Sequence, residues 1–254
     1  MRRPSSLLLV AVIFLAVSCG IPLDSSPRSI PDEELAAVTT TTTTTVVESG
    51  EKALFYYFAG DDKLLMTSRE VERLTPDDVI STALTPPSED DSELGLTTQV
   101  PEGTRLIDWH VDGSVLTIDL SEEFGIPQSP QVSKAAAQIV YSISQNLLGT
   151  GEPLRVDKYR FQIEGEDFPI VVETGQKETV TRCDFTNLLP VTEEATQTGT
   201  EPTFEPVAFA YYAGQPIDQE VGDETKAQAQ QNELWNQFSV SIALTLANCS
   251  ADDS

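Results

Sequence analysis

The chain has 254 residues, and 41 acidic against 15 basic side chains give it a formal net charge of −26. This charge repels phosphate backbones and anionic headgroups, which excludes nucleic acid as a partner and a basic patch as a membrane anchor. High negative charge usually serves solubility. A more specific interpretation of this charge is that the protein binds a cationic partner.

The first 19 residues have the pattern of an export signal that ends in a lipid-modified cysteine. Arg2 and Arg3 precede an apolar run over residues 7–17, which is shorter than the roughly 20 residues that span a bilayer and fits a signal peptide. Small residues stand before Cys19 as in a lipobox, with Ala16 where Leu is more usual. We therefore expect residues 1–18 to be removed and Cys19 to carry lipid, palmitate included. A plain signal peptide with an incidental cysteine is the alternative.

Residues 19–52 are predicted to be a tether. Pro22–Glu34 is polar and broken by prolines, and Thr39–Thr45 is an uninterrupted run of threonine. Segments of such low complexity cannot bury enough apolar surface to offset their ordering entropy. Behind a lipidated Cys19, this tether would hold a domain off the extracytoplasmic side of the cell membrane.

The cysteine count predicts one disulfide. The chain has three cysteines, so acylation of Cys19 leaves Cys183 and Cys249 as a pair in an oxidising compartment. Two free thiols are the alternative.

Residues 53–190 are predicted to form one α+β domain. The order strand, helix, hairpin, helix, strand indicates a small mixed sheet with two helices on one face. Thr75-Pro76 starts the first helix and Ser129-Pro130 the second, whereas Ser88–Glu93 is interpreted as a solvated acidic loop. The predicted strands are 53–59, 105–111, 115–120 and 159–163, followed by a closing hairpin of 170–173 with 179–182 around Gly175.

Alternation within the strands predicts which side chains face the core. Ile107, Trp109 and Val111 are expected to point inward on one strand of the hairpin, and Leu116, Ile118 and Leu120 on the other. The opposite face would then be polar. Its expected residues are Asp108, His110, Arg160, Gln162 and Glu164.

The same region resembles a known family, the GerMN domain, named for a spore germination and sporulation protein. The resemblance rests on the order and spacing of five segments: Gly95–Thr104, Val115–Leu120 with Phe124, Gln138–Ser142, Phe161–Gly165 and Asp184–Leu189. It implies an actinobacterial-type lipoprotein and a fold similar to ring-building modules that assemble large envelope complexes. It brings no established catalytic residues.

The remainder is predicted to be an acidic linker over residues 191–206 and a C-terminal extension over 207–254. Residues 207–213 indicate a strand and residues 223–235 a helix. Apolar positions over 234–246 fit both a strand and a helix, so periodicity leaves that choice open. Trp235, Phe238 and Ile242 must be buried somewhere, so we expect residues 207–249 to pack onto the domain.

The sequence offers little for catalysis, a metal or a cofactor. His110 is the single histidine, no Gly-x-Ser-x-Gly elbow or phosphate loop is present, and the ligands of a zinc site are lacking. We therefore expect no enzyme and no cofactor. The favoured function is an interaction or assembly module of the cell envelope with an envelope protein as partner. The alternatives are a binding protein for a small ligand or wall fragment and, third, a hydrolase.

Overall fold

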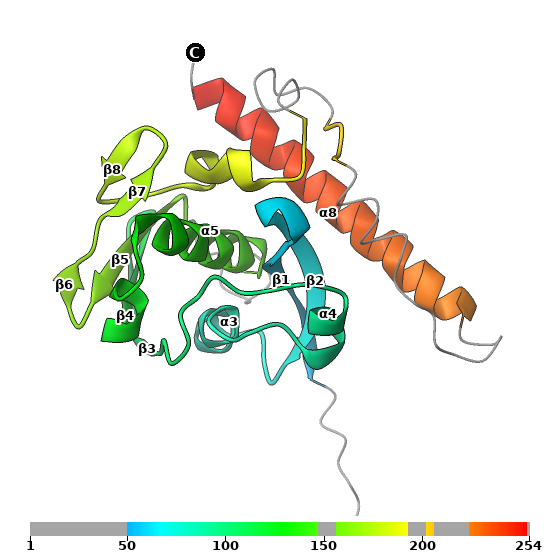
Figure 1. Ribbon diagram of the computed structural model, residues 1–254, viewed down its shortest axis with the longest axis horizontal. Helices are drawn as coiled ribbons and strands as arrows, with labels where there is room; N and C mark the ends of the chain where they lie inside the picture. The colour runs from blue at the N-terminus through cyan, green and yellow to red at the C-terminus, as the bar shows by residue number, and fades with distance from the viewer. Residues whose placement is uncertain (1–49, 147–155, 193–201, 206–223, 253–254) are drawn as a thin grey trace, which may run out of the picture. The chain divides into compact units, whose positions relative to one another are not determined.

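The structure is a computed structural model that describes residues 50–146, 156–192, 202–205 and 224–252 (Figure 1). All of them belong to one compact unit, Glu48–Ser254. The predicted signal peptide, Cys19, most of the tether and the predicted strand over 207–213 lie outside the described residues.

The first sheet is a two-stranded antiparallel hairpin of β1, Glu51–Ala59, and β2, Lys63–Val71. Both faces of β1 are covered, because Phe55, Tyr56, Tyr57 and Phe58 are all buried. β2 was not predicted from the sequence. Its continuous apolar run is only Leu64, Leu65 and Met66, all buried, which is shorter than the run of about four to eight residues that indicates a strand buried on both faces.

The helix α3, Pro76–Ala83, begins as predicted, with the Thr75 side chain accepting a hydrogen bond from the Asp78 N–H. The predicted acidic loop is wrong, because residues Glu89–Glu93 form a short helix, α4. Its Asp91 is only 7% exposed and accepts hydrogen bonds from Thr67 Oγ1 at 3.0 Å and Ser88 Oγ at 2.8 Å. One carboxylate of the acidic cluster is thus a buried acceptor that fixes α4 to β2.

The second sheet has the order β3–β4–β5–β6. Its strands are β3, Leu106–Asp112; β4, Val115–Leu120; β5, Lys158–Ile163; and β6, Glu166–Asp167. β3 and β4 form the predicted antiparallel hairpin, and β5 pairs with β4 in parallel. The register shifts between Leu106 and Asp108, and this irregularity leaves Ile107 47% exposed instead of inside.

The closing hairpin differs from the prediction. β7, Ile170–Val172, pairs with β8, Gly175–Lys177, and not with residues 179–182. Val180 instead forms an isolated bridge with Tyr159 of β5. The chain then enters a 3-10 helix, η4, Arg182–Leu188, which starts with a capping box between Thr181 and Asp184.

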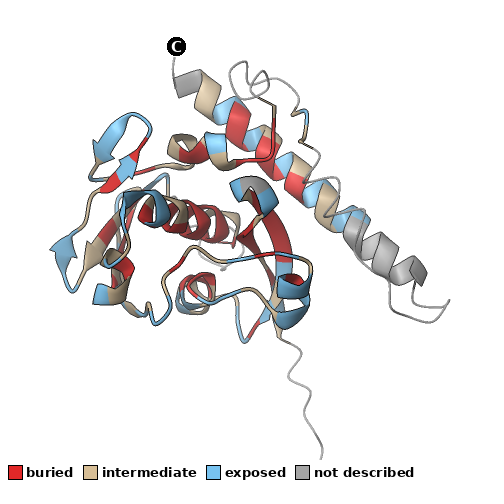
Figure 2. Ribbon diagram, viewed as in Figure 1, coloured by how far each residue is buried: buried red, intermediate tan, exposed pale blue. Residues whose placement is uncertain are grey.

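The predicted α+β class is confirmed, but its single small sheet is divided into separate sheets. The helix α5, Ser129–Asn146, also differs from a helix that lies on one sheet face. It contacts β1, α3, β7 and η4, and every residue from Ala135 to Ile143 is buried. Figure 2 shows this helix red along most of its length, in the interior of the unit.

Three buried polar residues on α5, four positions apart, hold the segments around it. Asn146 Nδ2 donates to the Leu54 carbonyl at 2.6 Å, and its Oδ1 accepts from the Leu54 N–H at 2.9 Å. Ser142 Oγ accepts from the Tyr56 N–H at 2.9 Å. Gln138 Oε1 accepts from the Gln99 N–H at 3.0 Å. We call Gln138, Ser142 and Asn146 the polar stripe. Ser142 and Asn146 supply β1 with hydrogen bonds along the edge that β2 does not occupy, and Gln138 holds the segment of Thr98 and Gln99.

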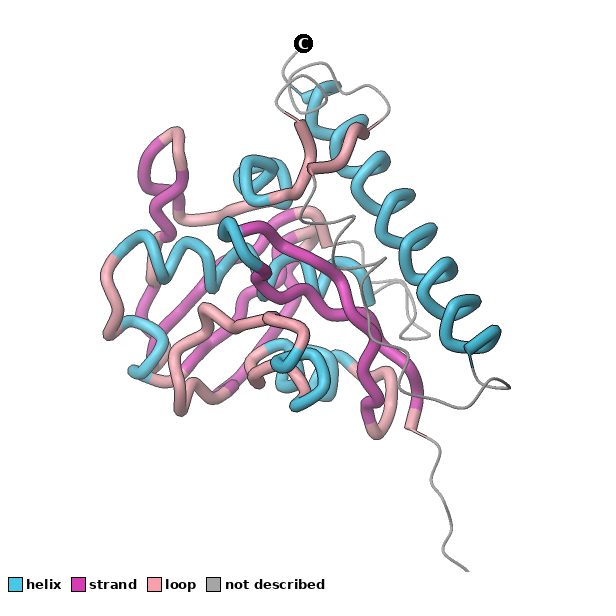
Figure 3. Tube along the Cα trace, turned by 45° about the vertical axis from the view of Figure 1, so that its right-hand side comes forward, coloured by secondary structure: helices cyan, strands magenta, loops and turns pink. Residues whose placement is uncertain are grey.

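The C-terminal extension contains one long helix, α8, Glu224–Asp252, which settles the choice between helix and strand. Phe238, Ile242 and Leu246 are buried at intervals of four residues, and α8 contacts β2 and η4. Figure 3 shows α8 running along the outside of the unit. Within the described residues, we find no helix with the length and apolar character needed to cross a membrane.

We expect the polar stripe to be essential for stability. Asn146→Leu leaves the N–H and C=O of Leu54 without partners, which should lower the free energy of unfolding by about 2–4 kcal/mol. Gln131→Leu makes the same exchange at an exposed position of α5 and should change it by less than about 0.5 kcal/mol. Urea unfolding of both variants tests this, and equal losses would contradict it.

Candidate functional site

The outer face of the second sheet is the candidate site. The register aligns three rows across β3, β4 and β5, and cross-strand neighbours share a face. The central row is His110, Thr117 and Arg160. The flanking rows are Asp108, Asp119 and Gln162 on one side and Asp112, Val115 and Lys158 on the other. We call these nine residues the outer face.

The outer face is polar and open to solvent on β3. Asp108, His110 and Asp112 are exposed, whereas Thr117 at its centre is 3% exposed. β3 is an edge strand, and the carboxylate of Asp108 accepts the Trp109 N–H at 2.8 Å. This side-chain bond occupies a backbone donor of the edge strand.

Two groups on β4 and β5 are fixed by the loop that follows β5. Asp119 Oδ1 accepts from the Gly165 N–H at 3.0 Å, and Gln162 Nε2 donates to Asp167 Oδ1 at 2.9 Å. Glu164, predicted to extend the polar row, lies past the end of β5 with a φ of 51°. Glu164 therefore belongs to the turn with Gly165, and the polar row on β5 ends at Gln162.

Arg160 is the unusual member of the outer face. Its Nε is buried and has no hydrogen-bond partner, and no described carboxylate forms an ion pair with it within 4.0 Å. A buried donor without a partner costs about 1–3 kcal/mol. The central row therefore contains a buried Arg160 Nε without a partner, between rows that carry Asp108, Asp119 and Asp112.

The sequence analysis identified Asp108, His110, Arg160 and Gln162, and the register places these four on one face. It missed Thr117 and Asp119, although the alternation of Leu116, Ile118 and Leu120 already implied that the residues between them face outward. The burial of the Arg160 Nε depends on side-chain packing, for which the sequence carries no signal.

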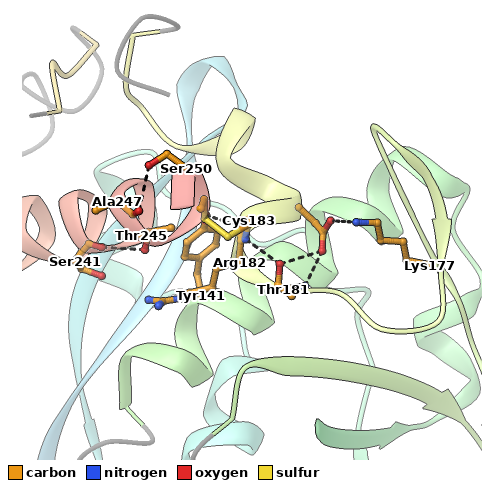
Figure 4. The surroundings of a disulfide bond; sticks show 11 residues. Tyr141, Lys177, Thr181, Arg182, Cys183, Ser241, Thr245, Ala247 and Ser250 are labelled. Carbon is orange, nitrogen blue, oxygen red and sulfur yellow. Dashed lines mark hydrogen bonds and ion pairs between the residues drawn. A yellow bond between two sulfur atoms is a disulfide. The ribbon is translucent and has the colours of Figure 1, made fainter. Parts of the chain in front are cut away.

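The junction between α8 and the domain is built around a disulfide. Cys183 of η4 and Cys249 of α8 are bonded, with their Cα atoms 5.2 Å apart (Figure 4). Next to it, the Tyr141 hydroxyl donates to the Arg182 carbonyl at 3.0 Å. Closing a loop of this length stabilises by about 4 kcal/mol in the chain-entropy model, so the bond holds the C-terminal end of α8 against η4.

A buried hydrogen-bond chain lies farther along the same junction. Tyr56 Oη donates to Ser241 Oγ at 3.2 Å, and Ser241 Oγ donates to Gln145 Oε1 at 2.7 Å. Burial raises the pKa of Tyr56 to about 12, and the hydrogen bond that Tyr56 makes with Ser241 lowers this pKa by less than burial raises it. Burial also raises the pKa of Tyr141 and of Tyr159. The hydrogen bonds from Tyr56 to Ser241 and from Ser241 to Gln145 link β1 and α5 to α8.

A small hollow beside the start of α5 does not offer free binding groups. Its volume is about 200 Å³. Lys134 in its wall pairs with Asp62 at 2.7 Å, Asp184 pairs with Lys177, and Glu173 accepts from Asn187. Across the described ranges, no group of three or more His, Cys, Asp or Glu side chains is placed to hold a metal ion.

Residues 55–168 match the family model Germane, described as sporulation and spore germination. Tandem GerMN domains of the sporulation protein GerM from Bacillus subtilis align with 21% identity and a TM-score of 0.41, covering 56% of this chain and 48% of that one. The first GerMN domain of GerM from Bacillus subtilis aligns with 13% identity and a TM-score of 0.39, covering 52% of this chain and 98% of that one. A lipoprotein candidate from Clostridium perfringens aligns with 16% identity and a TM-score of 0.35, covering 54% of this chain and 91% of that one.

This chain thus spans about half the length of the tandem structure it matches, 48%. A search of curated proteins gave no match.

Alkaline unfolding tests the buried junction. Above pH 10 the unfolded chain ionises at Tyr56 while the folded chain keeps its proton, so the free energy of unfolding should fall as the pH rises from about 10 to about 12. A shift of about two pKa units corresponds to at most about 3 kcal/mol. Tyr56→Phe should flatten this part of the stability curve, measured by urea unfolding at each pH. An unchanged slope would contradict the buried, protonated state of Tyr56.

Proposed function

We propose, from the premise that residues 55–168 form a GerMN domain, that this chain is a lipid-anchored extracytoplasmic lipoprotein whose domain acts as a non-catalytic interaction module of the cell envelope. The family match supports the domain. The lipobox pattern at Cys19 and the net charge of −26, which disfavours anionic surfaces, support a lipid as the anchor.

One observation carries the interaction role: the polar groups of the interior bond to the fold, whereas the outer face presents exposed polar side chains on β3, namely Asp108, His110 and Asp112. Gln138, Ser142 and Asn146 are all engaged with β1 or the 97–99 segment. His110 is exposed and Arg160 retains an unpaired buried Nε. A partner that docks on this row would contact the exposed His110 and the half-buried Arg160 side chain.

A catalytic or ligand-binding role has less support. His110 is exposed on the edge strand β3. The charged groups around the hollow beside α5 already bond one another, so a ligand would have to displace existing pairs.

Lipid attachment at Cys19 is tested by metabolic labelling with a palmitate analogue. The wild-type chain should be labelled and recovered with membranes, whereas Cys19→Ala should lose both properties. The double variant Cys183→Ala/Cys249→Ala keeps Cys19 and should still be labelled, which controls for a general effect of losing cysteines. Equal labelling of Cys19→Ala would disprove the anchor.

The outer face is tested by crosslinking in intact cells. A photoreactive residue at His110 should give adducts with an envelope protein, and one at the exposed Gln176 of β8 should not. Arg160→Ala in the His110 probe background should reduce the adduct about tenfold, because truncating an anchoring residue at an interface costs 1 kcal/mol or more. Identical adducts from both probe positions, or none from His110, would reject this face as the interface.

A further inference from the structure

The outward side of α8 has an unusual composition for this chain. Between Glu233 and Asp252 the sequence has no charged residue, although 22% of all residues are charged and the net charge is −26. Charge-free helical segments are expected in interiors, as in residues 135–146 of α5, which carry no charge and are largely buried. The described part of α8, in contrast, is buried on one side and exposed on the other (Figure 2).

The exposed side forms one continuous stripe. Val240 is 59% exposed and Leu244 is 58% exposed. Four more exposed residues extend the stripe toward both ends, and helical periodicity of 100° per residue puts all six within about one third of the circumference. They are Asn236, Gln237, Val240, Leu244, Ala247 and Asn248; we call them the outer stripe.

The outer stripe is symmetric about Ile242. When the sequence is reversed around this residue, Asn236 coincides with Asn248, Gln237 with Ala247 and Val240 with Leu244. Two such helices packed antiparallel would therefore set valine against leucine twice in the centre and asparagine against asparagine at both ends. An isologous two-fold interface requires this kind of self-complementarity.

We propose that the outer stripe is a homodimer interface, in which α8 of one copy packs antiparallel against α8 of a second copy. The absence of charge distinguishes this face from the rest of the surface. Two chains with a net charge of −26 each repel one another, whereas two outer stripes can make contact without bringing like charges together. The proposal does not depend on the role assigned to the sheet face.

The size of the outer stripe indicates a weak dimer. Residues 236–248 extend about 20 Å along the helix axis at 1.5 Å per residue. One helix face of that length buries well below the roughly 800 Å² per partner of a standard stable interface. Association should therefore need roughly 0.1–1 mM protein, and higher salt should strengthen it by screening the net charge.

Disulfide trapping detects a sparsely populated dimer and reports its direction. In a full-length Cys19→Ala background, differently tagged Val240→Cys and Leu244→Cys chains should crosslink on oxidation. Two Asn236→Cys chains should not, because antiparallel packing places these positions about 18 Å apart along the axis. Trapping that is absent from the first pair, or stronger for the Asn236 pair, would overturn the proposal.

A charge exchange gives an independent test by sedimentation of the full-length Cys19→Ala chain at about 0.5 mM. Leu244→Glu should weaken association at least tenfold, whereas Ile126→Glu, at a 75% exposed apolar residue away from α8, should leave it unchanged. Val240→Lys/Leu244→Glu should restore association, because each lysine then faces a glutamate of the other copy. Failure of that restoration overturns the antiparallel interface.

Thermal unfolding separates the dimer from an internal cover. If residues of the same chain covered the outer stripe, Leu244→Glu would lower the melting temperature at every protein concentration, and this result would overturn the proposal. An unchanged melting temperature in dilute solution, together with lost association at high concentration, supports it.

Discussion

The fold depends on how β1 obtains its second set of hydrogen bonds. β2 pairs with one edge of β1, and the other edge is completed by side chains of α5 and by a single bridge between Phe58 and Thr97. A strand with both faces buried cannot leave backbone groups unpaired without a cost of about 1–3 kcal/mol each. The polar stripe on α5 therefore acts in place of a third strand, and it fixes the position of the helix around which the other elements pack.

This constraint explains which parts of the fold were accessible from sequence. Elements with their own local signal were predicted well: Thr75-Pro76 starts α3, and the strands predicted at 105–111 and 115–120 form the hairpin of β3 and β4. β2 was missed because its apolar run, Leu64 to Met66, is only three residues long, and α4 because Asp91 resembled a solvated acid. In both cases the deciding contact is tertiary, with the Thr67 hydroxyl bonding the Asp91 carboxylate across 24 residues.

The candidate site shows the same division. Alternation along β3 and β5 was enough to place His110 and Arg160 on a common polar face. It could not indicate that the Nε of Arg160 is enclosed without a partner, since that depends on how neighbouring side chains pack. Nor could it show the irregularity that turns Ile107 outward, because a strand with a register shift has the same local composition as one without.

The polar stripe also bears on the order in which the chain acquires its structure. Asn146 stands 92 residues after the strand residue Leu54 that it completes. A chain that is synthesised with its N-terminus first presents the aromatic β1–β2 hairpin long before α5 follows. During that interval the unpaired edge of β1 is a template for any other extended segment. The first half of the domain is thus the part that is open to mispairing or to a holding chaperone, and arrival of the Gln138–Asn146 helix ends that exposure.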